Sequence, residues 1–340
     1  PVPLQHHDTI ILGHGSGGRL SHQLLDELII PALSGIPVSG QNDAAVLEHD
    51  GVRFAFTTDS YVVDPVFFPG GNIGDLAING TVNDLAMVGA RPRAISVGLI
   101  LEEGFSRREL GEILRAMREA ADRAGVAIVA GDTKVVPRGK ADRIFINTSG
   151  IGVFRHGLEI SGSNARVGDK ILINGTIGDH GIAVMAKREG LELEADIRSD
   201  CAPLNGLVDE ILSEGDAIRV LRDPTRGGVA TTLKEIALQS DVSITLNEAA
   251  LPLKGAVRGV CAVLGLDPLY VANEGKVLAF VAPDAAERIL EKMRRHPLGA
   301  ESAMIGEVTS PGGGKVRMET VVGGMRAVEM LSGEQLPRIC

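Results

Sequence analysis

Residues 72–101 read NIGDLAINGTVNDLAMVGARPRAISVGLIL, and this stretch decides the fold class. Its first part, Asn72–Val88, is rich in small and apolar residues and predicts a helix that is mostly buried. Its second part, Ala94–Leu101, is a short and mostly apolar run, which is typical of a strand. A helix that is followed closely by a strand indicates an α/β protein.

Shorter patterns of the same kind lie on both sides of this stretch. Before it we expect a helix at Ser21–Ile30 and strands at Thr9–Leu12, Ala44–Leu47 and Val52–Thr58. After it, Ser106 and Glu109 form a capping box, and the helix that they begin ends at Gly125. Two further strands, Val126–Ala130 and Arg143–Phe154, complete a first domain.

A polar, glycine-containing connection between Arg155 and Asp169 separates the two halves of the chain. In the second half we expect strands at Lys170–Asn174, Val242–Leu246 and Val277–Val281, and a strand pair formed by Ser302–Val308 and Lys315–Glu319. The expected helices are Gly181–Glu189, Leu207–Glu214, Val229–Gln239 and Pro283–Arg294. The sequence therefore predicts α/β domains at residues 1–155 and 166–331 and a mobile tail at residues 332–340.

Composition excludes several classes of function. The 340 residues carry 34 basic and 44 acidic side chains, a net charge of −10, which argues against nucleic acid and anionic membranes as partners. No apolar run is long enough to cross a bilayer, and residues 1–8 do not resemble a secretory signal, so we expect a cytoplasmic protein. The three cysteines form no CxxC pair, which gives no support to a disulfide framework or a zinc knuckle.

A glycine-rich segment, Gly13-His-Gly-Ser-Gly-Gly18, lies between an expected strand and an expected helix. It matches the G-x-G-x-x-G pattern of dinucleotide-binding loops, although the acidic residue that should follow is poorly matched. A plain glycine turn is an equally good interpretation. In both cases the amides of Gly15, Gly17 and Gly18 could contact a phosphate group at the start of the helix.

Four aspartates are more informative together than singly. Asp43 precedes an expected strand, Asp59 and Asp132 end expected strands, and Asp84 lies in the helix at 72–88. Carboxylates at one rim of a sheet are suited to Mg²⁺, which prefers oxygen ligands and often bridges to phosphates. The alternative for each aspartate is an ordinary turn or cap residue, and the spacing leaves both interpretations open.

Three further features of the second half could carry chemistry. Asp223-Pro-Thr-Arg-Gly-Gly228 could present an arginine and backbone amides to an anion, and Glu274 lies in an apolar setting that favours a raised pKa and a role as a base. Cys340 ends a proline-containing tail, and its thiolate needs a positive partner such as Arg338. We expect Cys201 and Cys261 to be core or turn residues.

Eight motifs occur in order along the chain: Gly13–Gly18, Asn42–Ala45, Phe67–Gly71, Val82–Ala86, Gly131–Lys134, Asp223–Gly228, Asn273–Lys276 and Pro337–Cys340. Together they resemble the superfamily of aminoimidazole ribonucleotide synthetase and selenophosphate synthetase. The final motif resembles its HypE branch, the carbamoyl dehydratases of nickel–iron hydrogenase maturation. The resemblance implies a two-domain α/β fold and a homodimer in which the N-terminal domains pair their sheets, with ATP bound near that interface.

The resemblance also implies roles for particular residues. Mg²⁺–ATP would be bound by Asp43, Asp59, Asp84 and Asp132, with Asn83, Thr133 and Lys134 at the nucleotide and with Gly15, Gly17 and Gly18 over the phosphates. Cys340 would accept a carbamoyl group from the carbamoyltransferase HypF. ATP would convert the carbamoyl group to a thiocyanate with Glu274 as base and Lys134 assisting, and the HypC–HypD complex would accept the cyano group.

Three alternatives stay open. A selenophosphate synthetase would need a reactive cysteine or selenocysteine near its N-terminal glycine loop, and residues 1–20 contain none. An aminoimidazole ribonucleotide synthetase has no need of a terminal cysteine. A carrier without enzyme activity would use Cys340 only to transport a group, and hydrolysis of ATP that depends on carbamoylated Cys340 would separate it from the enzyme.

Overall fold

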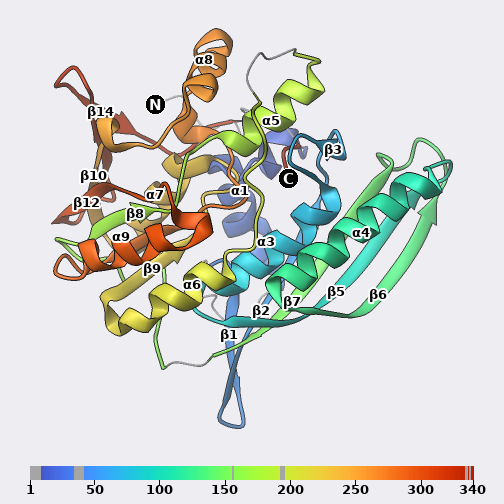
Figure 1. The fold of residues 1–340 in the computed structure, drawn as a ribbon, viewed down its shortest axis with the longest axis horizontal. Helices are drawn as coiled ribbons and strands as arrows, with labels where there is room; N and C mark the ends of the chain where they lie inside the picture. Colours follow the sequence, from blue (N-terminus) through green and yellow to red (C-terminus); the bar gives the residue numbers. More distant parts are fainter. Residues whose placement is uncertain (1–8, 34–41, 155–156, 192–195, 334–335, 337) are drawn as a thin grey trace.

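The computed structural model describes residues 9–33, 42–154, 157–191, 196–333, 336 and 338–340, and these residues fold around two large β-sheets (Figure 1). The N-terminal residues 1–8, where no secretory signal is expected, lie outside the described residues. So do residues 334, 335 and 337 of the expected tail.

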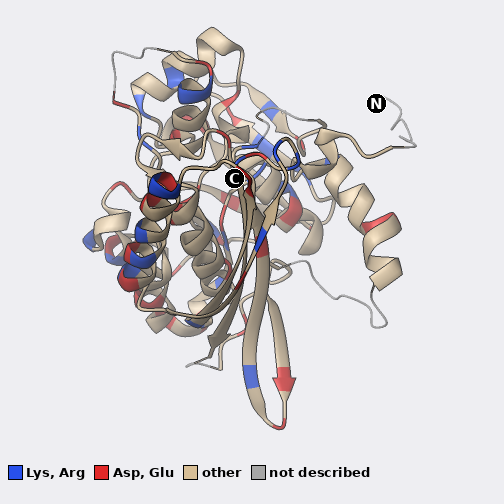
Figure 2. Ribbon diagram, turned by 90° about the vertical axis from the view of Figure 1, so that its right-hand side faces the viewer, with Lys and Arg blue, Asp and Glu red and all other residues tan. Residues whose placement is uncertain are grey.

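The first sheet has five strands in the order β1-β2-β7-β5-β6. The strands are β1 (Ala45–His49), β2 (Val52–Tyr61), β5 (Arg91–Glu102), β6 (Ala127–Val136) and β7 (Ile144–Val153). All neighbours are antiparallel except β5 and β6, which helix α4 joins in a crossover. The β1–β2 hairpin extends away from the body in both views (Figures 1 and 2).

Two helices cover one face of this sheet. Helix α3 (Ile73–Met87) begins where the Asn72 side chain accepts a hydrogen bond from the amide of Gly74, and the predicted helix at 72–88 is thereby confirmed. Helix α4 (Arg107–Ala124) begins at Ser106, whose hydroxyl accepts from the amide of Glu109. It ends at Gly125, which has the left-handed conformation (φ 68°) that glycine favours.

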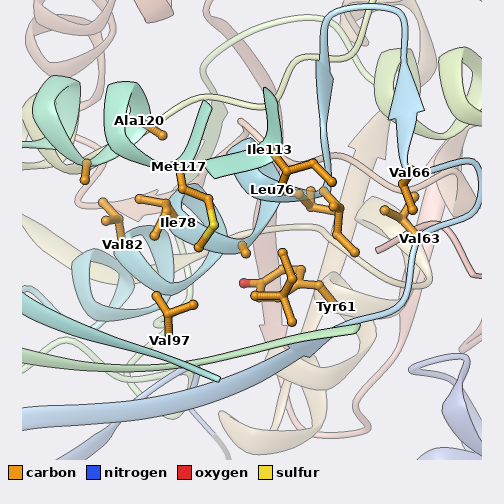
Figure 3. Close-up of a cluster of buried hydrophobic side chains, with 14 of the residues drawn as sticks. Tyr61, Val63, Val66, Leu76, Ile78, Val82, Val97, Ile113, Met117 and Ala120 are labelled. Atoms are coloured by element: carbon orange, nitrogen blue, oxygen red, sulfur yellow. The ribbon is translucent and has the colours of Figure 1, made fainter. Parts of the chain in front are cut away.

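The space between these helices and the sheet is filled by apolar side chains (Figure 3). Tyr61 at the end of β2 is almost fully buried there, in the same cluster as Leu76 and Ile78 of α3. The opposite face of the sheet exposes apolar side chains at Phe56, Ile100 and Ile151. Nine of the ten residues of β6 are exposed as well, so this strand and this face have no cover within the described chain.

The second sheet has seven strands in the order β14-β13-β10-β12-β8-β11-β9, antiparallel except for β10 and β13. They are β8 (Lys170–Ile173), β9 (Ile218–Arg222), β10 (Val242–Asn247), β11 (Leu278–Val281), β12 (Ala303–Pro311), β13 (Val316–Glu319) and β14 (Met325–Val328). Helices α6 (Asn205–Ile211) and α9 (Ala286–Arg295) share one buried cluster with it, and α7 (Gly228–Gln239) shares another. This sheet is therefore covered on both faces.

The remaining elements lie near the junction of the two sheets. The first element of the described residues is a 3₁₀ turn at Leu12–Gly15. Helical residues then run through α1 (Arg19–Leu24), a π-helical segment (Leu25–Ile29) and α2 (Ile30–Leu33). A short ribbon pairs β3 (Phe67–Phe68) with β4 (Gly71–Asn72). Helices α5 (Asp179–Arg188) and α8 (Gly255–Leu264) pack together, and the C-terminus lies between β3 and α5 (Figure 1).

The structure differs in several places from the elements predicted from the sequence. The strand predicted at Thr9–Leu12 is wrong, because the 3₁₀ turn begins at Leu12 and no strand forms at residues 9–11. The strand pair predicted from 302–308 and 315–319 is also wrong, because β10 lies between β12 and β13 and bonds to both. Strands β9 and β14 and helix α8 were not predicted at all. Strands β2 and β6 extend past Asp59 and Asp132, so these aspartates lie within strands rather than at their ends.

Candidate active site

Acidic side chains from both domains line one cavity of about 240 Å³. Asp43 precedes β1, Asp59 lies on β2 and Asp84 lies on α3, so the first domain supplies three of them. The second domain supplies Asp223, which follows β9, and Glu274, which precedes β11. The other residues lining the cavity are Thr57, Thr58, Tyr61, Gly80, Thr225, Arg226 and Cys340.

Burial dominates the electrostatics of this cavity. Desolvation, together with repulsion between neighbouring carboxylates, raises the pKa of Asp84 and of Asp223 well above the usual value for an aspartate. Desolvation raises the pKa of Asp43 to about 6, against the attraction of Arg222. Asp84 accepts a hydrogen bond of 2.9 Å from the hydroxyl of Thr57. The cavity thus holds more negative charge than its surroundings balance.

Two arginines supply the positive charge at this site. Arg222 at the end of β9 is nearly buried and pairs with Asp43 at 2.9 Å and with Glu235 at 2.8 Å, so its charge is already engaged. Arg226 lies 4.0 Å from Asp59 and belongs to the turn that begins α7. Among the described residues that line the cavity, Arg226 is therefore the cation that can face a bound group.

Glu274 is held firmly through its backbone. The side chain of Asp200 accepts from its amide, and the side chain of Asn83 donates to its carbonyl oxygen at 3.3 Å. Its carboxyl group is buried, which raises its pKa well above that of an ordinary glutamate, and its Oε1 atom finds no hydrogen-bond donor among the described residues. The expectation of a buried Glu274 with a raised pKa is met.

Asn83 itself lies outside the cavity lining. Its amide donates to the carbonyl oxygens of Ala202 and Glu274, and its Oδ1 accepts from the amide of Leu204. The side chain thus connects helix α3 to two segments of the second domain. This geometry orients Glu274 and leaves Asn83 no free polar atom to offer a nucleotide.

The Cys340 thiol lies inside the cavity, because the last residues fold into the protein. The amide of Val62 donates to the carbonyl oxygen of Cys340, and the side chain of Ile339 is buried in the core of the first domain. Burial raises the pKa of the Cys340 thiol to about 12, although Arg226 opposes the shift. Arg338, the positive partner expected from the sequence, instead pairs with Asp142 and donates to the carbonyl oxygen of Val62.

The glycine-rich loop lies next to the tail. Gly15 lines a second cavity of about 160 Å³ together with Val62, Arg226 and Cys340. Gly17 has a left-handed conformation (φ 73°), and a Cβ atom there would lie 2.7 Å from the Cβ of Arg226. A Cβ on Gly18 would lie 2.3 Å from the carbonyl oxygen of Leu331. These two glycines therefore permit a close approach to Arg226 and to the start of the tail.

The structure does not bring Asp132, Thr133 or Lys134 to this cavity within one chain. All three lie on the exposed strand β6, where Lys134 pairs with Asp132 at 2.7 Å. That hydrogen bond lowers the pKa of Asp132, in contrast to the raised pKa values inside the cavity. Asp43, Asp59 and Asp84 meet as the sequence predicts, and Asp132 does not join them.

The donor set fits a Mg²⁺ ion that arrives with a nucleotide. Among the described residues, no three His, Cys, Asp or Glu side chains stand close enough to form a complete metal site. Mg²⁺, however, is commonly held by one or two carboxylates and completes its shell with phosphate oxygens and water. The buried Oδ2 atom of Asp43 has no hydrogen-bond donor among the described residues and is suited to such a ligand role.

Comparisons with known proteins agree with this architecture. The sequence matches the N-terminal domain of AIR synthase related proteins at residues 41–154 and the C-terminal domain at residues 166–319. A carbamoyl dehydratase HypE from Azotobacter vinelandii is 53% identical over 332 residues, which are 98% of this chain and 97% of that protein. The chain is thus an AIR synthase related protein with both domains of that class.

Solved structures narrow the assignment. A HypE–HypF complex matches with a TM-score of 0.87 at 49% identity, over 91% of this chain and 99% of that chain. A HypE structure in complex with ATP matches with a TM-score of 0.82 at 51% identity, over 98% of this chain and 100% of that chain. The chain belongs to the HypE family of carbamoyl dehydratases.

Several residues of the site had no signal in the sequence. Thr57 and Tyr61 lie in an ordinary β-strand, and Asp200 lies in a loop without a recognisable motif. Arg222 ends a strand that was not predicted. A search for charged residues next to the motif at 223–228 would have found Arg222, whereas the position of Asp200 beside Glu274 follows only from the tertiary fold.

Among the described residues, the structure has no helix long and apolar enough to cross a membrane.

Proposed function

We propose that this chain uses ATP to dehydrate a carbamoyl group carried on the sulfur of Cys340, so that a thiocyanate remains. One observation carries the proposal: the Cys340 thiol lines the acidic cavity of its own chain, together with Asp84, Arg226 and Glu274. Membership of the carbamoyl dehydratase family supports the same reaction.

The reaction balances with ATP as the only co-reactant. The carbamoyl oxygen attacks the γ-phosphorus of ATP, and ADP leaves. The oxygen is now part of a phosphate, which is a good leaving group, so the C–O bond breaks as the nitrogen gives up its two protons. The products are a nitrile carbon on sulfur, ADP and hydrogen phosphate, which keeps one of the two protons, while the other proton is released; nothing is oxidised or reduced.

Glu274 is suited to accept a proton from the carbamoyl nitrogen. Its raised pKa makes its carboxylate a stronger base than an exposed glutamate, and its Oε1 atom is free to accept. Arg226 faces the same cavity and can stabilise negative charge that develops on the phosphoryl oxygens. Both groups are held by backbone and side-chain contacts before a substrate binds.

Asp43, Asp59 and Asp84 would hold the magnesium ion that accompanies ATP, and the glycine loop with Gly15 and Gly17 would cover the phosphates. When bound, Mg²⁺ neutralises charge on the transferred phosphoryl group. The excess of buried carboxylates in the cavity supports this role, since their raised pKa values show how poorly the protein alone balances their charge.

The exposed strand β6 supports a homodimer that completes the site. Its apolar residues Ile128, Val129 and Val135 are exposed together with Asp132 and Lys134. If the first sheets of two copies pair along this face, Asp132, Thr133 and Lys134 of one chain would reach the nucleotide site of the other. This arrangement explains why Lys134 can assist catalysis although it lies outside the cavity of its own chain.

The partners follow from the chemistry of the bound group. We expect a HypF carbamoyltransferase to load Cys340, and a HypC–HypD complex to accept the cyano group, in the cytoplasm. A solved HypE–HypF complex at 49% identity supports the first of these partners.

The test is intact mass spectrometry of the chain after incubation with HypF, carbamoyl phosphate and ATP. The expected result is a carbamoyl adduct that converts to a species lighter by one water, and Cys340→Ala should show neither species. A carbamoyl adduct that persists while ATP is not hydrolysed would contradict the proposal and favour the carrier.

A further inference from the structure

Helix α5 contacts the tail at two positions that neither the motifs nor the proposed chemistry explains. His180 stands in its first turn, and Arg188 is its last residue. Both side chains bond to backbone carbonyl oxygens of the tail. Neither residue lines the acidic cavity.

Arg188 joins the tail to the segment that follows β2. Its Nε atom donates to the carbonyl oxygen of Asp64 at 2.7 Å, and its Nη2 atom donates to that of Arg338 at 2.7 Å. The same two segments also bond directly, since the amides of Val62 and Asp64 donate to the carbonyls of Cys340 and Arg338. The guanidinium group is therefore a fork that spans both sides of a short strand-like pairing.

His180 bonds to the next carbonyl along the tail. Its Nε2 atom lies 2.9 Å from the carbonyl oxygen of Ile339, and its Nδ1 atom lies 2.8 Å from the hydroxyl of Ser199. A carbonyl oxygen can only accept, so the ring carries its proton on Nε2 and accepts from Ser199 on Nδ1. Burial lowers the pKa of His180, and its ring packs edge-on against Phe68 at 5.4 Å, which keeps it neutral and in place.

The side chain of Ile339, which lies between the two contacted carbonyl groups, is also held in place. Ile339 is 3% exposed and lies in the same buried cluster as Val63, Val66 and Val184. Val184 lies on α5, between His180 and Arg188 in sequence. Backbone bonds and an apolar contact thus place Cys340, the following residue, in the cavity.

We propose that His180 and Arg188 are positioning residues that hold the tail inward and thereby place the Cys340 sulfur in the acidic cavity. They recognise main-chain atoms of the tail. The use of this placement rests on the proposed function, because the proposed reaction takes place on the Cys340 sulfur. The placement itself can be tested without the reaction.

The test is the rate at which a fluorescent maleimide labels each cysteine of the ligand-free chain at pH 7.5, read by peptide mass spectrometry. Replacing Arg188 with Met or His180 with Leu should label Cys340 about tenfold faster, since each removes a hydrogen bond that favours the inward position. Cys261 of the same chain is the internal control, and its labelling rate should not change. Cys201 cannot serve as a control, because its amide donates to the Ser199 hydroxyl that His180 contacts.

Three further variants sharpen the result. Arg188→Lys keeps the charge but loses the fork, so labelling should be intermediate, and His180→Gln keeps a donor for the Ile339 carbonyl and should be nearly normal. Arg118→Met, in an exposed i,i+4 pair of α4, is the matched control and should behave as the unaltered chain. If His180→Leu does not fold, Arg188→Met and His180→Gln still decide the question.

Two outcomes would overturn the assignment. Unchanged labelling of Cys340 in Arg188→Met would show that the fork does not hold the tail. Parallel acceleration at Cys261 would show a general loosening of the fold. The assay needs neither ATP nor a partner. Faster labelling of Cys340 in Arg188→Met, together with absent dehydration in the unaltered chain, would therefore count against the proposed reaction alone.

Discussion

The chain places two groups of functional side chains, one around buried carboxylates and one on an exposed strand, in opposite surroundings. Asp43, Asp84 and Glu274 line a cavity that also holds Cys340, and desolvation raises their pKa values. Asp132 lies on the exposed strand β6 beside Lys134, and its pKa is lowered. The sheets differ in the same way, since the second is covered on both faces and the first on only one.

A residue that matches a family motif can therefore act in its own chain or in a second copy of the chain, and the motif alone does not show which. The buried group meets within one chain. Asp132 and Lys134 lie on strand β6, which has no cover among the described residues, and in the proposed homodimer a second chain would bring them to a site.

The largest effect is expected inside the cavity. Glu274→Gln should slow thiocyanate formation by about 10²–10⁴-fold, because the proton acceptor is lost. Glutamine is nearly isosteric with a protonated glutamate, so the folded chain should still bind ATP. Single-turnover conversion of carbamoylated Cys340, followed by intact mass, measures the rate. A rate within twofold of the unaltered chain would rule out Glu274 as the base.

The second largest effect is expected for Lys134 on the exposed strand β6. Lys134→Ala should slow the same step by about 10²-fold, because a cation that stabilises the phosphoryl group is lost. Mixing and reassembling Lys134→Ala with Glu274→Gln should restore about one quarter of the sites, since half of the dimers are mixed and each has one intact site. If mixing restores nothing, Lys134 does not act in the site of a partner chain.

A smaller effect is expected on assembly. Val129→Glu places a charge on the exposed strand β6 and should weaken dimerisation at least about tenfold, because the carboxylate would be buried in the interface. Val322→Glu, at an exposed apolar position of the second domain, is the matched control and should leave dimerisation unchanged. Light scattering over a dilution series measures both. Equal behaviour of the two variants would contradict pairing through β6.

The smallest effect is on stability and depends on pH. The pKa of Asp43 is raised from 3.8 to about 6, so the folded chain binds this proton more tightly than the unfolded chain does. The resulting stability is complete below about pH 4 and is lost as the pH rises through 6. Asp43→Asn should therefore remove about 2 kcal/mol of the fall in unfolding free energy between pH 4 and pH 7.

Denaturant unfolding of the ligand-free chain at several pH values measures this slope. The control is Asp132→Asn, whose aspartate has a lowered pKa and is exposed, so its loss should not reduce the fall. A slope that Asp43→Asn leaves unaltered would show that the carboxyl of Asp43 is not held in the raised state.

Local sequence predicted the elements whose signals are local. The helix at 72–88 and the capped helix from Ser106 follow from spacing and caps, and the structure confirms both. The pairing of β10 with both β12 and β13 did not follow, because strand order depends on contacts far apart in sequence. The same limit applies to the site. The burial of Glu274 was predictable from its apolar neighbours, whereas the approach of Arg226 and the seat of the tail depend on long-range packing.

The way in which the tail is bound has a consequence for the order of the reaction steps. The described contacts reach the carbonyls of Arg338, Ile339 and Cys340 and the side chain of Ile339, and among them no hydrogen bond reaches the sulfur of Cys340. Contacts that do not involve the sulfur do not by themselves distinguish the free thiol from the carbamoyl form or the cyano form, and contacts common to all forms cannot favour one form over another. On the proposed reaction, the order of steps would therefore come from the cleavage of ATP and from removal of the cyano group by its acceptor.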